Sequence, residues 1–186
     1  MDGVWTADQV RAAEGALMAE LPEGTLMRRA AFGLAVTATR MLGTPLPGTR
    51  VALLVGSGDN GGDALWAGYE LRRRGVGVTA VLMNPERAHP AGLVALRRVG
   101  GRVVAGTDPA APQVVRRAQL VIDGIVGISG RGALRDPAPA LVAAADEAGV
   151  PILACDLPSG VDCDTGAVAG PAVTAAATVT FGTRKP

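Results

Sequence analysis

Three short segments combine glycines with carboxylate, amide and hydroxyl side chains, the groups that bind phosphates and hard cations. They are GSGDNGGD at 56–63, DGIVGISGRG at 123–132 and DLPSGVD at 156–162. Each follows or closes an apolar run rich in β-branched residues, which is typical of a buried strand. Because ligands bind beyond the carboxyl ends of the strands in an open parallel sheet, we expect the three segments to converge on one crevice.

The first segment contains a G-x-G-x-x-G pattern at Gly56, Gly58 and Gly61. Glycines at these positions would let backbone N–H groups at a helix N-terminus approach a phosphate. The dinucleotide-binding form of this pattern also needs an acidic residue about 20 residues later, to bind the ribose hydroxyls. The second apolar run ends instead in Met-Asn-Pro at 83–85. A conventional NAD-dependent oxidoreductase is therefore disfavoured, and no histidine, tyrosine or lysine is placed to move the accompanying proton.

Other chemistries are excluded by residues that the chain lacks. His89 is the single histidine and is interpreted as an exposed loop residue, which disfavours a Ser-His-Asp triad, and one histidine is too few for a histidine zinc site. Cys155 and Cys163 are too few for a disulfide framework and favour a reducing cytoplasm. A formal net charge of +1 and 3% aromatic residues argue against nucleic-acid binding.

The sequence predicts neither a secretory signal nor a membrane span. The first ten residues, MDGVWTADQV, have no basic region followed by an apolar one. The longest uncharged run, 165–183, is interrupted by three glycines and a proline, which would leave backbone polar groups unsatisfied in lipid. We expect a cytoplasmic protein without membrane contact.

The hydrophobic periodicity predicts an α/β fold. A capping-box pattern at 6–9 and helical spacing predict helices over 7–20 and 25–42. Short apolar runs then alternate with amphipathic segments. We expect strands over 51–56, 76–83, 102–105, 119–123, 150–156 and 177–182, and helices over 63–74, 90–99, 109–118 and 137–148. This alternation predicts a three-layer, doubly wound, mostly parallel sheet of the Rossmann-like type, preceded by two extra N-terminal helices.

The 186 residues suit a single domain over 1–186. No internal repeat, low-complexity tract or interdomain linker interrupts the pattern. Because the chain stops at 183–186 directly after an expected strand, we also expect it to be truncated at its C-terminus.

Together, the three segments resemble the NAD(P)H-hydrate epimerase family, the YjeF N-terminal-domain family. The family's glycine loop, G-x-G-N-N-G-G-D-G, is similar to residues 56–64, and its D-x-P-S-G with a following V-D/N and T-G is similar to 156–166. A closing T-V-T-F-G…K-P and an N-terminal helix with Glu14 before L-M-x-R-A also match, so the resemblance covers essentially the whole chain. Two departures are Asp59 for the usual asparagine and Ala64 for the usual glycine.

The resemblance implies an isomerase that interconverts the R and S epimers of hydrated NADH and NADPH, called NAD(P)HX, in nicotinamide-cofactor repair. It implies K⁺ bound by Asn60, Asp123 and Ser159. The implied substrate contacts are Asp59, Asn60, Gly61, Gly62, Asp63, Gly127, Ile128, Ser129, Gly130, Arg131, Gly132 and Asp156. The partners would be the small-molecule substrate and an ADP- or ATP-dependent NAD(P)HX dehydratase, fused or separate, and a homodimer stays open.

Charge favours a cation independently of the resemblance. The three segments carry a single basic side chain, Arg131, beside several carboxylates that would face an anionic dinucleotide. Those expected to approach the crevice are Asp59, Asp63, Asp123 and Asp156. The hard oxygen donors of Asn60, Asp123 and Ser159 suit a monovalent cation. The alternative is that Asp123 merely hydrogen-bonds the backbone of its own glycine loop.

Asp156 is the residue expected to act as the catalytic acid or base. Inversion requires the C–O or C–N bond at the hydrated carbon to break and re-form, and a shielded carboxyl beside Cys155 and Leu157 can transfer the proton that this needs. Ring opening and transient loss of water both remain open as routes. The alternative function is a non-catalytic nucleotide-binding or scaffold domain of the same fold.

Overall fold

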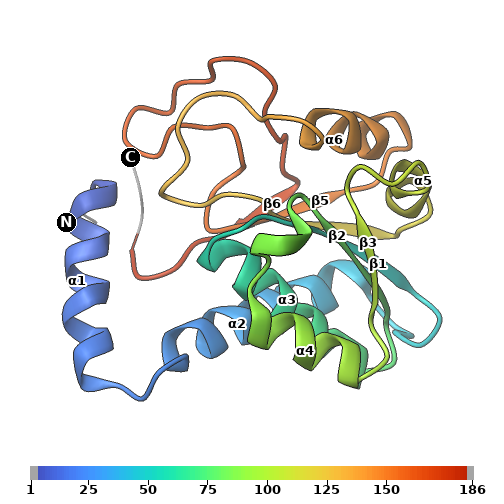
Figure 1. Ribbon diagram of the computed structural model, residues 1–186, viewed down its shortest axis with the longest axis horizontal. Coiled ribbons are helices and arrows are strands. Elements are labelled where there is room, and N and C mark those ends of the chain that lie inside the picture. The colour runs from blue at the N-terminus through green and yellow to red at the C-terminus, as the bar shows by residue number, and fades with distance from the viewer. Residues whose placement is uncertain (1–3, 184–186) are drawn as a thin grey trace.

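A computed structural model describes residues 4–183 and confirms the α/β architecture. One six-stranded sheet has the order β3-β2-β1-β4-β5-β6, and all five pairings are parallel. The strands are β1 (Arg50–Val55), β2 (Gly77–Leu82), β3 (Arg102–Ala105), β4 (Leu120–Gly124), β5 (Ile152–Cys155) and β6 (Ala177–Val179). The strand order reverses between β1 and β4, so the carboxyl ends of these two strands form the switch point at which such sheets bind ligands (Figure 1).

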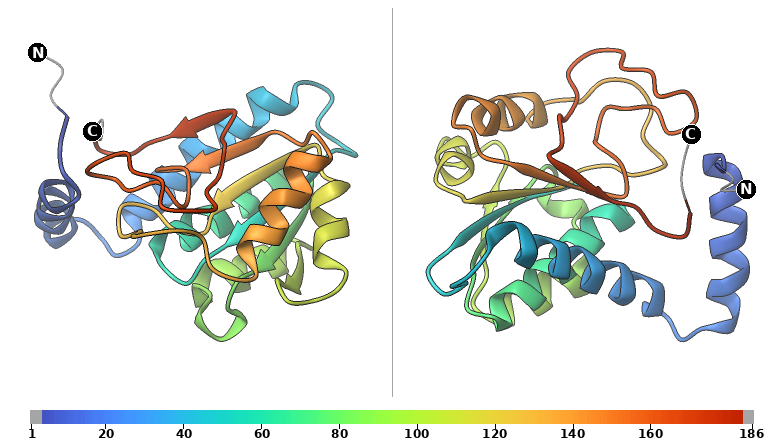
Figure 2. Two further views of the ribbon diagram at one scale, coloured as in Figure 1. Left: turned by 90° about the horizontal axis from the view of Figure 1, so that it is seen from above. Right: turned by 180° about the vertical axis from the view of Figure 1, so that it is seen from behind.

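Helices cover both faces of this sheet (Figure 2). On one face lie α2 (Thr25–Leu42), α3 (Asp59–Arg73) and α4 (Pro90–Arg98), and on the other lie α5 (Ala111–Arg116) and α6 (Ala138–Glu147). A 3₁₀ turn, η1 (Pro85–Arg87), precedes α4, and α1 (Ala7–Glu20) precedes α2. Among residues 4–183, no helix combines the length and the apolarity that crossing a bilayer requires.

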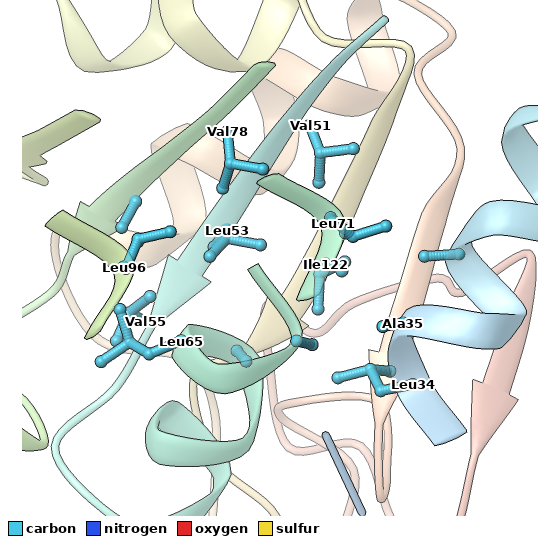
Figure 3. Packing of buried hydrophobic residues seen from close by; sticks show 14 of the residues in the cluster. Leu34, Ala35, Val51, Leu53, Val55, Leu65, Leu71, Val78, Leu96 and Ile122 are labelled. Atoms are coloured by element: carbon cyan, nitrogen blue, oxygen red, sulfur yellow. The ribbon is translucent and has the colours of Figure 1, made fainter. Parts of the chain in front are cut away.

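The buried strand side chains alternate between two cores. Leu53 and Val55 of β1 and Ile122 of β4 pack with Leu65 of α3 and Leu96 of α4, as Figure 3 shows. On the opposite face, Ala52, Leu54 and Val121 pack against α5 and α6. Because successive side chains of a strand point to opposite faces, strands covered on both sides are apolar at almost every position. β4 illustrates this, since all five of its residues are buried.

Helix α3 begins at Asp59, so the predicted start at Asp63 is wrong. The glycine segment forms the first turn of the helix instead of a loop before it. Gly58 is the extended N-cap, and an added Cβ at Gly61 would collide with the carbonyl of Gly56. The absence of side chains here lets the helix start lie directly against the end of β1, where a larger residue would force a longer loop.

Other element boundaries differ by a few residues from the predicted ones. β5 begins at Ile152 and not at 150, since Pro151 has no N–H to donate. β6 ends at Val179 and not at 182, because the backbone N–H of Phe181 donates to the Asp156 carboxylate instead of continuing the ladder. α5 spans 111–116 and is shorter than the predicted 109–118, because the helix already ends at its C-cap residue, Arg117.

We predict that Gly61→Ala lowers the free energy of unfolding by about 2–3 kcal/mol, because its methyl group has no space beside the Gly56 carbonyl. Gly33→Ala, in the middle of α2, is the matched control. An added Cβ at Gly33 meets nothing within 4 Å, so it should stabilise the protein by roughly 0.5–1 kcal/mol. Urea unfolding measures both, and equal effects of the two substitutions would contradict the close approach.

Candidate functional site

The three segments converge at the carboxyl edge of the sheet, as expected. Gly56 N donates to Gly124 O at 3.0 Å, which joins the first segment to the second. Val126 N donates to Ser159 Oγ at 3.1 Å, which joins the second to the third. A Cβ added at Gly127 would lie 3.0 Å from Asp156 Oδ2 and 3.2 Å from Asn60 Oδ1. Gly127 therefore marks the point at which all three segments meet.

Asp123 and Ser159 form a buried cluster beneath this meeting point. The Asp123 side chain is fully buried, and its Oδ2 accepts from Ser159 N at 2.8 Å while its Oδ1 accepts from Ser159 Oγ at 2.7 Å and Ile125 N at 3.2 Å. Burial raises the pKa of Asp123 to about 6, although the hydrogen bonds from Ser159 and Ile125 oppose the shift. Within residues 4–183, no lysine or arginine forms an ion pair with Asp123. The cluster thus holds a carboxylate whose charge has hydrogen bonds but no cationic partner.

Two polar side chains in the first turn of α3 are buried without complete hydrogen bonding. Asn60 and Asp63 are each 9% exposed, and within residues 4–183 Asn60 Nδ2 and Asp63 Oδ1 have no hydrogen-bond partner. The N-cap residue Gly58 has no side chain to bond the free N–H groups of this turn. A buried unpaired polar group costs about 1–3 kcal/mol, so its presence in a native fold indicates that a ligand or water completes it.

Asp63 also differs from an ordinary carboxyl in its acidity. Burial, followed by the negative charges of Asp59, Asp156 and Glu14, raises the pKa of Asp63 to about 8. Asp63 therefore carries a proton at neutral pH and can donate it, which an exposed aspartate cannot do.

Asp156 is held in a strained backbone conformation at the end of β5. Its φ of 68° is the one positive value of a non-glycine residue in the described part of the chain. Its N–H donates to Val179 O at 2.7 Å, and Oδ1 accepts from Thr180 Oγ1 at 3.4 Å and Phe181 N at 3.5 Å. Such a conformation costs roughly 1–3 kcal/mol and occurs preferentially at functional sites. The strain turns the carboxylate so that Oδ2 lies beside Gly127.

The remaining predicted contacts lie farther from this centre. Asp59 and Ser129 are exposed. The Arg131 guanidinium is half-exposed and lies 3.3 Å from Asp164 Oδ2 and 3.8 Å from Asp162 Oδ2. It therefore has carboxylate partners from the protein itself, contacts that sequence inspection did not predict.

Several neighbours of the site were missed in the sequence. Met27 and His89 lie against Gly62, where a Cβ would be 2.7 Å from Met27 Cε and 3.1 Å from His89 Cγ. The interpretation of His89 as an exposed loop residue is wrong. His89 is half-buried and caps α4, with Nδ1 accepting from Gly92 N at 3.1 Å. The one available signal was His89-Pro90, a cap residue before a proline that favours a helix start.

The raised pKa of Asp63 predicts a pH dependence of stability. Its folded-state pKa of about 8 lies above the ordinary 3.8, so its stabilising contribution is complete below about pH 4 and is lost as the pH rises toward 8. The Asp63→Asn variant has no carboxyl at this position, so its stability does not fall with pH for this reason. The stability of the variant relative to the natural chain should therefore grow from pH 5 to 8, by up to about 1.4 kcal/mol per pH unit, and level off above.

Urea unfolding at pH 5, 6, 7, 8 and 9 measures this difference. Asp146→Asn on the exposed side of α6 is the control and should show no comparable trend. A stability difference between Asp63→Asn and the natural chain that stays constant across the range would contradict the raised pKa.

Comparison with known proteins gives a consistent result. The family model described as YjeF-related protein N-terminus matches residues 23–186. A protein of Mycobacterium tuberculosis named bifunctional NAD(P)H-hydrate repair enzyme Nnr is 52% identical over 185 residues, which are 98% of this chain and 38% of that protein. A protein of Clavibacter michiganensis named NAD(P)H-hydrate epimerase is 43% identical over 195 residues, covering 99% of this chain and 81% of that one.

The fold has a close counterpart among solved structures. The crystal structure of the yeast protein YNL200c superposes with a TM-score of 0.87 at 23% identity, covering 99% of this chain and 82% of the yeast chain. This similarity supports the fold, while the sequence comparisons identify the lineage. This chain spans little more than a third of the length of the mycobacterial relatives it matches. On the family match and the identity to these relatives, the chain belongs to the family of YjeF-related protein N-termini.

Proposed function

We propose that this chain interconverts the R and S epimers of NAD(P)HX. The observation that carries this proposal is a pair of carboxyls in unlike environments at the switch point of the sheet: the buried Asp63 in the first turn of α3, and Asp156, whose charge acts on Asp63 and whose Oδ2 lies beside Gly127. Two relatives are named for NAD(P)H-hydrate repair or epimerisation. We also propose that residues 1–186 form a single domain and that the protein lies in the cytoplasm, since the buried Cys155 and Cys163 form no disulfide within residues 4–183.

Epimerisation needs a group that gives a proton and a group that takes one. If water leaves the hydrated carbon, the hydroxyl is protonated as the C–O bond breaks, and the water that adds to the other face loses a proton. If the ring opens, the hydroxyl gives up its proton and the ring nitrogen takes one as the C–N bond breaks, and both transfers reverse on closure. Both routes return every proton, so no oxidant or reductant is consumed. Asp156 is the proposed catalytic residue, and Asp63, protonated at neutral pH, is its proposed partner.

The substrate would lie across the segments that meet at Gly127. The first turn of α3 offers the N–H groups of residues 59–61, which precede the first helical hydrogen bond, for a phosphate, and the unpaired Asn60 Nδ2 and Asp63 Oδ1 for polar atoms of the hydrated nucleotide. The segment 127–132 would form the opposite wall. These assignments leave the exposed Asp59 as a peripheral contact.

A potassium ion fits the donor set beside this site. The fully buried Asp123 carboxylate has no cationic partner in the described part of the chain, and Ser159 Oγ and Asn60 Oδ1 are further hard oxygen donors. We assign K⁺ to Asn60, Asp123 and Ser159. When bound, the ion would neutralise the Asp123 charge. The hydrogen bonds of Ser159 to Asp123 and Val126 then keep the second and third segments in register.

The proposed partner is an ADP- or ATP-dependent dehydratase that acts on the S epimer. The name bifunctional of the mycobacterial relatives, together with the share of them that this chain spans, supports a fused arrangement. A separate dehydratase would receive the same product.

We predict that the protein accelerates consumption of the R epimer when both epimers are mixed with an S-specific dehydratase. Asp156→Asn keeps the shape of the side chain and removes its proton transfer, so the rate should fall by about 10²- to 10⁴-fold. Asp146→Asn, an exposed substitution in α6, is the matched control and should leave the rate unchanged.

Two outcomes would count against this assignment. No acceleration by the natural chain would favour the non-catalytic nucleotide-binding or scaffold function. Acceleration that survives Asp156→Asn at nearly the natural rate would place the acid or base at another residue.

We also predict that potassium stabilises the fold. At 100 times its Kd, a ligand that binds the folded state alone adds about 2.7 kcal/mol. The melting temperature should therefore be higher in potassium chloride than in tetramethylammonium chloride at equal ionic strength, with sodium chloride as a third condition. Asp123→Asn should abolish the difference, whereas Asp146→Asn should retain it. Equal melting temperatures of the natural chain in all three salts would remove the cation from the site.

A further inference from the structure

Helix α1 contributes little to the hydrophobic core. Ala7 and Val10 are its only buried residues, and the larger side chains of Leu17 and Met18 are 43% and 54% exposed. Figure 2 shows the helix standing apart from the sheet, on the side toward which β5 and β6 point. Since an isolated helix of 14 residues is marginal in water, contacts outside the core must hold it there.

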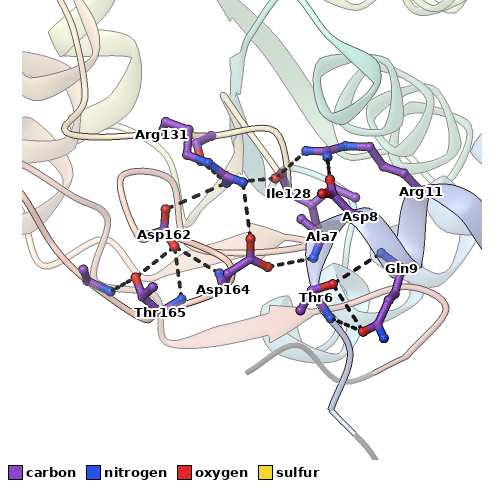
Figure 4. Close-up of polar contacts among 12 residues, drawn as sticks. Thr6, Ala7, Asp8, Gln9, Arg11, Ile128, Arg131, Asp162, Asp164 and Thr165 are labelled. Atoms are coloured by element: carbon purple, nitrogen blue, oxygen red, sulfur yellow. Dashed lines mark hydrogen bonds and ion pairs between the residues drawn. The ribbon is translucent and has the colours of Figure 1, made fainter.

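Those contacts are polar and join the start of α1 to the segment 127–132 and to Asp164, which follows the segment 156–162 (Figure 4). Ala7 N, in the first turn, donates to Asp164 Oδ1 at 2.7 Å. Arg11 Nη2 donates to Ile128 O at 3.2 Å. A capping box between Thr6 and Gln9 fixes the same turn. A carboxylate at a helix N-terminus is also favoured by the helix dipole, so Asp164 both anchors and stabilises α1.

Asp164 connects α1 to Arg131 in the segment 127–132. Its Oδ2 lies 3.3 Å from Arg131 Nη2, while Oδ1 accepts from Ala7. Asp162 lies 3.8 Å from Arg131 Nη1 and is itself held by hydrogen bonds from Asp164 N and Thr165. The carboxylate of Asp164 is thus shared between the helix and the segment.

The segment 127–132 needs such external contacts. It contains Gly127, Gly130 and Gly132, and its one backbone hydrogen bond among those outside helices and strands runs from Gly130 N to Gly127 O, at 2.8 Å. Glycine loses more conformational entropy on ordering than any other residue. Within the segment, Arg131 Nη1 donates to Gly130 O at 3.0 Å and to Ile128 O at 3.5 Å. Arg11 at the Ile128 carbonyl and the Asp164 carboxylate at Arg131 are the contacts that tie this outer half to α1.

Helix α1 also reaches the first segment. Glu14, two turns after Ala7, is one of the charges that raise the pKa of Asp63 in α3. The helix therefore lies close to all three segments, although the family model matches only from residue 23 onward.

We propose that α1 is a latch for the site, in which Asp164 and Arg11 are positioning residues that hold segment 127–132 in its substrate-binding shape. The substrate in this statement rests on the proposed function, whereas the latch itself can be tested without any substrate.

The first test is hydrogen exchange of the ligand-free protein. Asp164→Ala removes the anchor of α1 and the partner of Arg131, so exchange of amides in both 7–14 and 127–132 should quicken by about five- to thirtyfold. Asp164→Asn keeps an oxygen for Ala7 N but loses the charge that faces Arg131. It should restore protection of 7–14 and leave 127–132 faster than in the natural chain.

The matched control is Arg116→Ala, which breaks the ion pair with Glu147 between α5 and α6 at 3.0 Å. It should change exchange in neither region. Unchanged exchange of 127–132 in Asp164→Ala and in Arg11→Ala would overturn the latch, whatever the activity of the protein.

The second test is kinetic. If the segment is held by α1, Asp164→Ala and Arg11→Ala should raise KM for NAD(P)HX by about five- to thirtyfold and change kcat by less than about threefold. Asp164→Asn should raise KM less than Asp164→Ala does, and the control Arg116→Ala should leave KM at the value of the natural chain. Faster exchange with an unchanged KM would overturn the positioning role. A natural chain inactive on NAD(P)HX would overturn the proposed function, while the exchange data would still decide the latch.

Discussion

The arrangement of the site depends on one buried carboxylate at the end of β4. Asp123 receives the backbone N–H and the hydroxyl of Ser159 with its two oxygens, which fixes the segment after β5 against the segment after β4. Ser159 Oγ in turn accepts from the N–H of Val126, one residue before Gly127. The position of Gly127 beside Asp156 follows from this chain of bonds. An apolar residue at 123 would leave the N–H groups of Ser159 and Ile125 and the Ser159 hydroxyl without these acceptors, and asparagine would keep only one of the two oxygens.

The buried negative charge of Asp123 lowers the stability of the folded protein. A completely buried carboxylate without a cationic partner destabilises the folded state unless a cation balances its charge or the group keeps its proton. The raised pKa of Asp123 has this cause, since burial disfavours its charged form. Asp63 solves the same problem by holding a proton. Asp156, at the same edge of the sheet, is instead oriented by the strained turn after β5 and by donors that follow β6. Aspartates with unlike surroundings can therefore perform unlike roles within one site.

Much of the fold could be predicted from the sequence, because strand and helix periods alternate clearly after residue 50. The positions of Asp123 and Asp156 at strand ends followed from that alternation, and so did their convergence with Asn60. The start of α3 could not be predicted, since glycines usually mark a loop, and only the close approach of Gly61 to Gly56 shows why they are tolerated in a helix. The positive φ of Asp156 could not be predicted either, because aspartate, although enriched in that region, adopts it at only a small fraction of its positions.

The contacts of α1 lay beyond prediction for a different reason. Asp164 and Ala7 are 157 residues apart, and their hydrogen bond depends on where an almost coreless helix lies against the completed sheet. Hydrophobic periodicity indicates which face of a helix is buried. Because α1 buries only Ala7 and Val10, its periodicity does not predict where the helix lies against the sheet. A sequence whose apolar pattern fixes the sheet can thus leave the position of its outermost element to a few charged and polar side chains. The glycine-rich segments at the site make few contacts with the hydrophobic core, so polar side chains are what holds them in place.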